Sequence, residues 1–78
     1  MHSKDARAVT EHLNNMDHVL QVLTLDAGQC VLLVISTGGY CTYMPQRGIT
    51  IVSEDDALVI ADSYWHKATL QKAIKAHR

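Results

Sequence analysis

The sequence predicts an α+β fold in which a four-stranded antiparallel meander sheet is flanked by an N-terminal and a C-terminal helix, in the order α-β-β-β-β-α. Three observations predict it. An apolar stripe with helical spacing opens the chain, four apolar segments separated by short turns follow, and a segment with helix-capping signals closes it. The 78 residues make a single domain, residues 1–78, close to the lower size at which domains fold alone.

The first helix is expected to begin at Ser3, which suits an N-cap, with Asp5 in the first turn. It is expected to end near Asn15, because asparagine and aspartate favour caps and turns over helix interiors. The same spacing continues through Leu20 and Leu23, so a helix that runs to residue 25 is the alternative. The stripe that defines the helix consists of Ala6, Val9, Leu13 and Met16.

Four strands follow, because each segment is rich in β-branched and apolar residues and is bounded by turn residues. A four-residue loop, Asp26–Gln29, separates the first two strands. Gly38-Gly39 suits a two-residue hairpin turn, and Pro45–Gly48 suits a type I turn that a glycine bulge closes. The expected strands are His18–Leu25, Cys30–Thr37, Tyr40–Met44 and Ile49–Val52.

The last helix has the clearest end signals. Ser53 suits an N-cap with Asp56 three residues later, acidic residues fill the first turn, and basic residues lie near the C-terminus. One continuous helix is therefore expected; the alternative makes residues 57–61 a fifth strand. The expected inner face, with Trp65 on its flank, consists of Ala57, Ile60, Ala61, Tyr64, Ala68 and Ile74.

The turns also predict strand pairing, and the pairing assigns each side chain to a face of the sheet. Leu25 should face Cys30, Thr37 should face Tyr40, and Tyr43 should face Ile49. One face is then almost entirely apolar and is expected to receive both helices. It holds Val19, Leu23, Leu25, Cys30, Leu32, Val34, Cys41, Tyr43, Ile49 and Ile51.

The opposite face is also apolar at its centre, whereas a meander with one wet face would alternate apolar and polar residues. Each large aliphatic side chain gains roughly 1.5–3 kcal/mol on full burial, so this face needs a cover. We expect it to form a homodimer by packing sheet on sheet; the alternative is one helix on each face and no interface. The expected interface consists of Leu20, Val22, Val31, Leu33, Ile35, Tyr40, Met44 and Val52.

Composition excludes some functional classes. The net charge is −1, from seven basic and eight acidic residues, which argues against nucleic acid as a partner. The longest apolar run, Val31–Ile35, is far shorter than the ~20 residues that span a bilayer. The N-terminal residues lack the apolar core of a signal peptide, so the protein is expected to be cytoplasmic, with reduced cysteines.

No catalytic, cofactor or metal site is expected. None of the five histidines has a second histidine four residues away, and the two cysteines, Cys30 and Cys41, are too far apart for a Cys-x-x-Cys pair. Ser36–Gly39 resembles a phosphate loop, but a strand and not a helix is expected after it. We read the acidic run Glu54–Asp56 as helix capping.

By elimination, the sequence favours a small non-enzymatic adaptor, inhibitor or regulator that binds a protein partner as a homodimer. By analogy alone, small proteins of this kind are common in phages and mobile elements. The alternatives are a small-molecule binding module, with a pocket near the tyrosines and the tryptophan, and a small enzyme at a dimer seam with His18 or His66 as its base. The candidate ligand or partner contacts are Tyr43, Tyr64, Trp65 and His66, although core packing is the preferred role for Tyr64 and Trp65.

Overall fold

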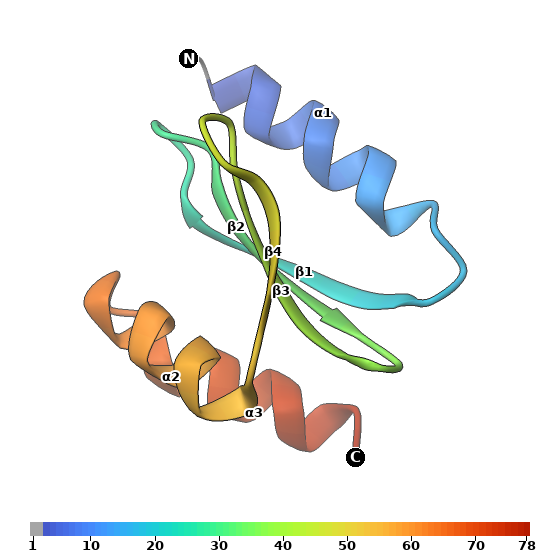
Figure 1. The fold of residues 1–78 in the computed structure, drawn as a ribbon, viewed down its shortest axis with the longest axis vertical. Helices are drawn as coiled ribbons and strands as arrows, with labels where there is room; N and C mark the ends of the chain where they lie inside the picture. The colour runs from blue at the N-terminus through green and yellow to red at the C-terminus, as the bar shows by residue number, and fades with distance from the viewer. Residues whose placement is uncertain (1–2) are drawn as a thin grey trace.

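The computed structural model describes residues 3–78, with side chains from residue 6 onward. The elements are α1 (Ser3–Asn14), β1 (Val19–Asp26), β2 (Val31–Ser36), β3 (Gly39–Met44), β4 (Gly48–Val52), α2 (Glu54–Ser63) and α3 (Lys67–Ala76) (Figure 1). The strands form one antiparallel sheet in the order β1-β2-β3-β4, which confirms the α+β meander. The single C-terminal helix was wrong, because two helices follow the sheet.

The break between α2 and α3 keeps the C-terminal segment against the sheet. One continuous helix over residues 54–76 would be about 35 Å long at 1.5 Å per residue. The break folds the second half back onto the sheet. Both halves then contribute buried residues to the same cluster, Ala57 and Ala61 from α2 and Leu70 from α3. The alternative strand at residues 57–61 was also wrong, because these residues lie inside α2.

The structure tests two predicted helix ends, the start of α2 and the end of α1. The Ser53 side chain caps α2 by accepting a hydrogen bond from the backbone N–H of Asp56 at 3.1 Å, as expected. The helix α1 ends at Asn14, one residue before the predicted end, and a helix to residue 25 was wrong. Its stripe packs inward, with Ala6 and Leu13 buried. The expected cap at Ser3 and Asp5 lies outside the described side chains.

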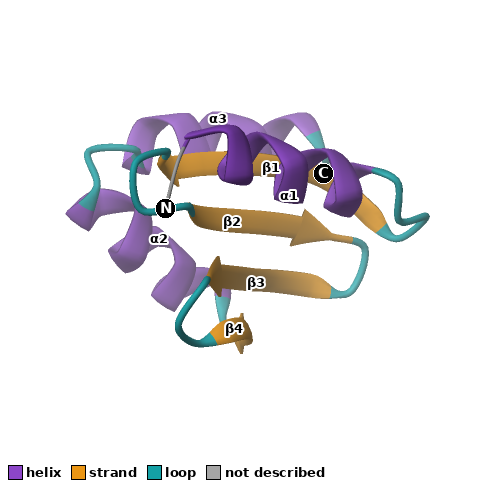
Figure 2. Ribbon diagram, turned by 90° about the horizontal axis from the view of Figure 1, so that it is seen from above, coloured by secondary structure: helices purple, strands orange, loops and turns teal. Residues whose placement is uncertain are grey.

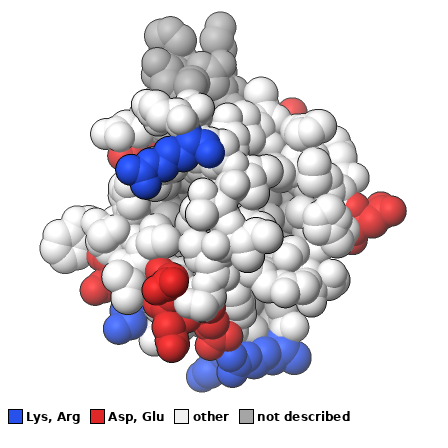
Figure 3. All heavy atoms as spheres, viewed as in Figure 1, with Lys and Arg blue, Asp and Glu red and all other residues white. Residues whose placement is uncertain are grey.

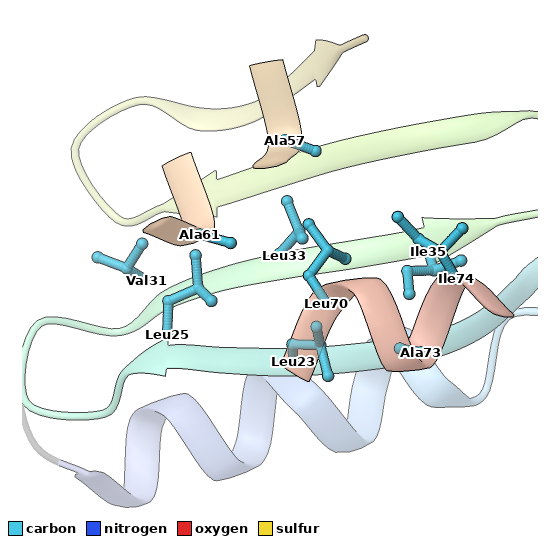
Figure 4. Packing of buried hydrophobic residues seen from close by; sticks show 10 residues of the cluster. All are labelled: Leu23, Leu25, Val31, Leu33, Ile35, Ala57, Ala61, Leu70, Ala73 and Ile74. Atoms are coloured by element: carbon cyan, nitrogen blue, oxygen red, sulfur yellow. The ribbon is translucent and has the colours of Figure 1, made fainter. Parts of the chain in front are cut away.

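The helices divide unequally between the two faces of the sheet. Figure 2 shows α1 across β1 and β2 on one face, and α2 and α3 on the other. On the α2–α3 side, Leu33 and Ile35 of β2 pack in one cluster with Leu23 and Leu25 of β1 and with both helices (Figure 4). On the α1 side, a smaller cluster joins Leu13 to Leu32 and Val34. The fold is therefore a three-layer sandwich with one thin side.

The observed register corrects the predicted faces of β1. Leu23 lies opposite Leu33, and Val22 lies opposite Val34, so each is on the face opposite to the one predicted. Two irregularities in the pairing cause this, between Val19 and Gln21 and between Thr24 and Asp26. A one-residue slip transfers a strand's side chains to the other face.

The other two pairings kept the predicted faces. Between β2 and β3, Val34 lies opposite Cys41, whereas Ser36 was expected there. A shift of two residues leaves every side chain on its predicted face. Between β3 and β4, Tyr43 lies opposite Ile49, as predicted. Gly48 has φ of +70°, which confirms the glycine at the end of the proline turn.

The face that was expected to be an interface is covered within the chain. Val31, Leu33 and Ile35 are buried beneath α2 and α3, and no second subunit is needed to cover them. Half-buried members of the predicted set, Tyr40, Met44 and Val52, pack against the same cluster, while Val22 packs on the α1 side and Leu20 remains 41 % exposed. A helix on each side of the sheet, the alternative to an interface, describes the structure.

Candidate interaction surface

The half of the sheet that α1 leaves without a helix exposes two large aliphatic side chains next to each other. We call it the uncovered half-face, and it consists of Cys41 and Tyr43 of β3 with Ile49 and Ile51 of β4. The side chains of Ile49 and Ile51 are 57 % and 83 % exposed. Alternate residues of a strand point to the same face, so the two isoleucines lie side by side next to Tyr43 and Cys41.

A small hollow continues this surface towards α1. Its volume is about 110 Å³, and its lining is mainly apolar. Leu13 of α1 and Met16 of the loop that follows it form one wall, Ile49 of β4 forms the other, and Cys41 lies between them. His18, which is exposed, stands at the rim. The hollow and the half-face together make a groove along β3 between α1 and the sheet edge.

The strand β4 is also a free edge. It pairs only with β3, and its five residues, Gly48–Val52, include no charged side chain. Edge strands present unpaired backbone N–H and C=O groups, and proteins usually protect them with charges, prolines or a covering segment. Figure 2 shows β4 at the margin of the molecule with no helix beyond it. This edge is therefore open to pairing with another strand.

A second exposed aromatic site lies at the turn between α2 and α3. Trp65 is 93 % exposed and has φ of +65°. Its N–H donates to the carbonyl of Asp62, and the N–H of His66 donates to that of Ala61, which is the Schellman pattern that usually ends in glycine. Core packing was the preferred role for Trp65, and that was wrong.

A groove of about 530 Å³ lies between α2 and α3. Leu58 and Ile74 line it together with the charged residues Glu54, Lys72, Lys75 and Arg78. One side is an ion pair, in which the guanidinium of Arg78 donates to both carboxylate oxygens of Glu54 at 2.8 and 3.0 Å. The hydroxyl of Tyr40 donates to the same carboxylate at 3.0 Å, which ties the C-terminus to β3.

This ion pair predicts a pH dependence of folding. The hydrogen bond from Arg78, and then the one from Tyr40, lowers the pKa of Glu54 below 4.5. Because the folded-state pKa is depressed, the stabilisation is present above pH 4.5 and is lost as the pH falls through the folded-state value. Urea unfolding should therefore show Glu54→Gln to be less stable than wild type at pH 7, with the gap closing at pH 3. A gap of constant size would contradict the coupling.

Tyr40 should act in the opposite direction at alkaline pH. Partial burial, and then the hydrogen bond to Glu54, raises the pKa of Tyr40 above 10.0. The stabilisation linked to this proton is present below pH 10 and is lost as the pH rises through the folded-state value. The same urea unfolding series, extended to pH 11 with Tyr40→Phe as the control, measures this loss of stability at alkaline pH.

The structure does not gather the predicted ligand contacts into one pocket. Tyr43 packs on the α1 side of the sheet, whereas Tyr64 packs against the α2–α3 cluster on the opposite side. Trp65 points to solvent, and His66 is half-buried at the start of α3. Sequence reasoning missed Ile49 and Ile51 because it assigned both helices to their face. The width of the predicted sheet could have indicated their exposure. One helix is only about two strands wide, so it cannot cover four strands.

Within the described residues, no cluster of three or more histidine, cysteine or acidic side chains is placed to bind a metal ion. Both cysteines are thiols; Cys30 is buried in the β1–β2 turn, and Cys41 is half-buried. None of the described helices has the length and hydropathy of a membrane-spanning segment. None of the protein-family models, curated proteins or solved structures compared with this chain matches it.

Proposed function

We propose that this protein is a non-enzymatic binding protein, an adaptor, inhibitor or regulator, that holds an amphipathic helix of a protein partner on its uncovered half-face. One observation carries the proposal: β3 and β4 expose a continuous apolar surface on the side where α1 covers only β1 and β2. A single-domain protein of this size seldom leaves large adjacent aliphatic side chains in water without a use.

The shape of the surface favours a helix as the bound element. Two neighbouring strands are about 10 Å wide, which matches the diameter of one helix with its side chains. The chain itself provides the precedent, because α1 lies on β1 and β2 through Leu13 and the half-buried Val9. A partner helix beside α1 would present its own apolar stripe at spacings of three and four to Tyr43, Ile49 and Ile51.

Protein binding ranks above small-molecule binding for a structural reason. The groove between α2 and α3 is open to solvent, and most of its lining residues carry charges that water solvates well. The uncovered half-face, in contrast, is apolar, and its adjoining hollow of about 110 Å³ is small, which suits a large partner better than a small ligand.

Photo-crosslinking from the rim of the groove tests the proposal. A benzophenone maleimide attached through His18→Cys, in a Cys41→Ser background, places the reactive group beside the hollow; Cys30 is fully buried and should not react. The crosslinked partner segment should carry apolar residues at helical spacing. Tyr43→Lys should abolish the crosslink, whereas Tyr64→Lys should retain it.

Tyr64→Lys is a matched control, since it changes another half-buried tyrosine on the opposite side of the sheet. Thermal melts of both variants establish that they are folded. A crosslink that survives Tyr43→Lys, or a crosslinked segment without an amphipathic pattern, would refute this function. Neither substitution lies in β4 or changes its outer backbone edge, so the test does not require that edge to be paired or free.

A further inference from the structure

The two edges of the sheet differ in how well they are protected. β1 carries Asp26 and has two irregularities in its pairing, and bulges of this kind twist an edge away from flat pairing. β4 has a regular register along all five residues, no charge and no proline. Ile49, Thr50 and Ile51 are β-branched, which suits strand pairing. Of the two edges, β4 is the one built to accept another strand.

We infer that β4 pairs with β4 of a second copy of this chain, antiparallel and about a two-fold axis at Thr50. This register places Thr50 opposite its own counterpart, Ile49 opposite the partner's Ile51, and Gly48 opposite the partner's Val52. The pairing is self-complementary, because every isoleucine meets an isoleucine on the same face. Two four-stranded sheets then become one continuous sheet of eight strands.

Charges at the two ends of β4 favour a second copy of this chain, rather than an unrelated strand, as the pairing partner. Arg47 precedes β4, and Asp55 and Asp56 follow it in the first turn of α2. None of the three forms an ion pair within the described residues. Figure 3, in the view where β4 runs down the front, shows acidic atoms grouped near the start of α2, uncharged atoms above them, and a basic side chain above those.

Antiparallel self-pairing brings these opposite charges together twice. In the register centred on Thr50, Arg47 lies opposite the partner's Ser53, directly before the partner's acidic first turn. The partner's Asp55 and Asp56 follow in the first turn of α2, so this register brings the long Arg47 side chain to the acidic end of the partner's β4. The two-fold axis repeats the contact at the other end of the strand. A parallel pairing would instead place Arg47 beside the partner's Arg47.

Stacking of two α1 faces is a poorer solution. The outer side of α1 carries the exposed polar residues Arg7, Glu11, His12 and Asn14, and Arg7 and Glu11 form an ion pair at 3.8 Å. Burying that surface between two sheets would remove charges from water. Edge pairing leaves α1 solvated and keeps both uncovered half-faces on the same side of the extended sheet. The dimer holds whether or not the half-face binds a partner.

Disulfide trapping at the axis tests the register. In a Cys41→Ser background, Thr50→Cys places two thiols on opposed residues, where Cα atoms of paired strands lie about 4.5–5.5 Å apart and can form a disulfide. Mild oxidation should convert most of this variant to a covalent dimer of twice 8.7 kDa. Thr24→Cys is the matched control, an exposed threonine on the other edge strand, and should remain monomeric on a non-reducing gel.

Charge reversal tests the partner. By light scattering, wild type should be dimeric. Arg47→Glu should raise the dimer dissociation constant at least tenfold. The double variant, Arg47→Glu with Asp55→Arg, should return the dissociation constant to the wild-type value. All these positions are exposed, so the monomer fold should persist, as a cooperative melt would verify. A wild-type chain that stays monomeric at millimolar concentration would overturn the inference. The inference would also be overturned if Arg47→Glu left the dimer unaffected and Thr24→Cys formed the disulfide-linked dimer as readily as Thr50→Cys.

Discussion

Leu33→Asp is expected to unfold the domain. Leu33 is completely buried at the centre of the cluster that joins β2 to α2 and α3. The substitution removes a buried leucine and leaves a carboxylate without a partner, and together these changes cost more than about 5 kcal/mol. A domain of this size has a total stability of roughly 4–12 kcal/mol. Far-UV circular dichroism should therefore show loss of structure at 25 °C.

The control for this prediction is Leu20→Asp. Leu20 belonged to the same predicted interface but is 41 % exposed on β1, so the change should cost less than about 1 kcal/mol. If both variants melted cooperatively near the wild-type temperature, α2 and α3 would not cover this face. If wild type were a dimer and Leu33→Asp a folded monomer, the sheet-on-sheet interface predicted from the sequence would be restored.

Trp65→Gly is expected to stabilise the protein. Trp65 adopts φ of +65°, a region that is unfavourable for a residue with a Cβ atom, and its exposed ring loses little packing on removal. Relief of this strain should exceed the extra chain entropy of glycine and give about 1 kcal/mol. For a domain of this size that corresponds to a rise of about 4–8 °C in Tm.

The companion variant is Trp65→Ala. Alanine removes the indole ring but keeps the Cβ atom, so Tm should stay close to wild type. A rise with alanine as large as that with glycine would mean that the ring, and not the backbone, destabilises the turn. A fall in Tm with both variants would mean that the ring packs on the protein. Differential scanning calorimetry of the three proteins distinguishes these results.

The local signals in the sequence were read correctly where the physics is local. The apolar stripe of α1, the cap at Ser53 and the glycine at position 48 depend on residues within one or two turns of each other. The pairing of Tyr43 with Ile49 was predicted because the proline turn sets its own register. The absence of a glycine or proline between α2 and α3 hid the break, since Trp65 occupies the position where glycine is usual.

The candidate surface could not be read in the same way. Ile49 and Ile51 have the pattern of a covered face, and only the placement of α1 over β1 and β2 leaves them in water. The faces of β1 were misassigned because its two irregularities depend on how β1 and β2 twist together. The interface set was misread because the second half of the C-terminal segment folds back to cover it.

The sequence by itself therefore determined the class of the fold, the order of the strands and the ends of most elements, because capping, turn chemistry and periodicity act over a few residues. Only the tertiary structure decided which face each helix covers and which apolar residues remain exposed. The sheet is four strands wide, and a single helix covers about two of them. Two helices lie on one side of the sheet and one on the other, and this arrangement leaves β4 uncovered on the α1 side. The arrangement depends on packing between distant segments, which local sequence patterns do not predict.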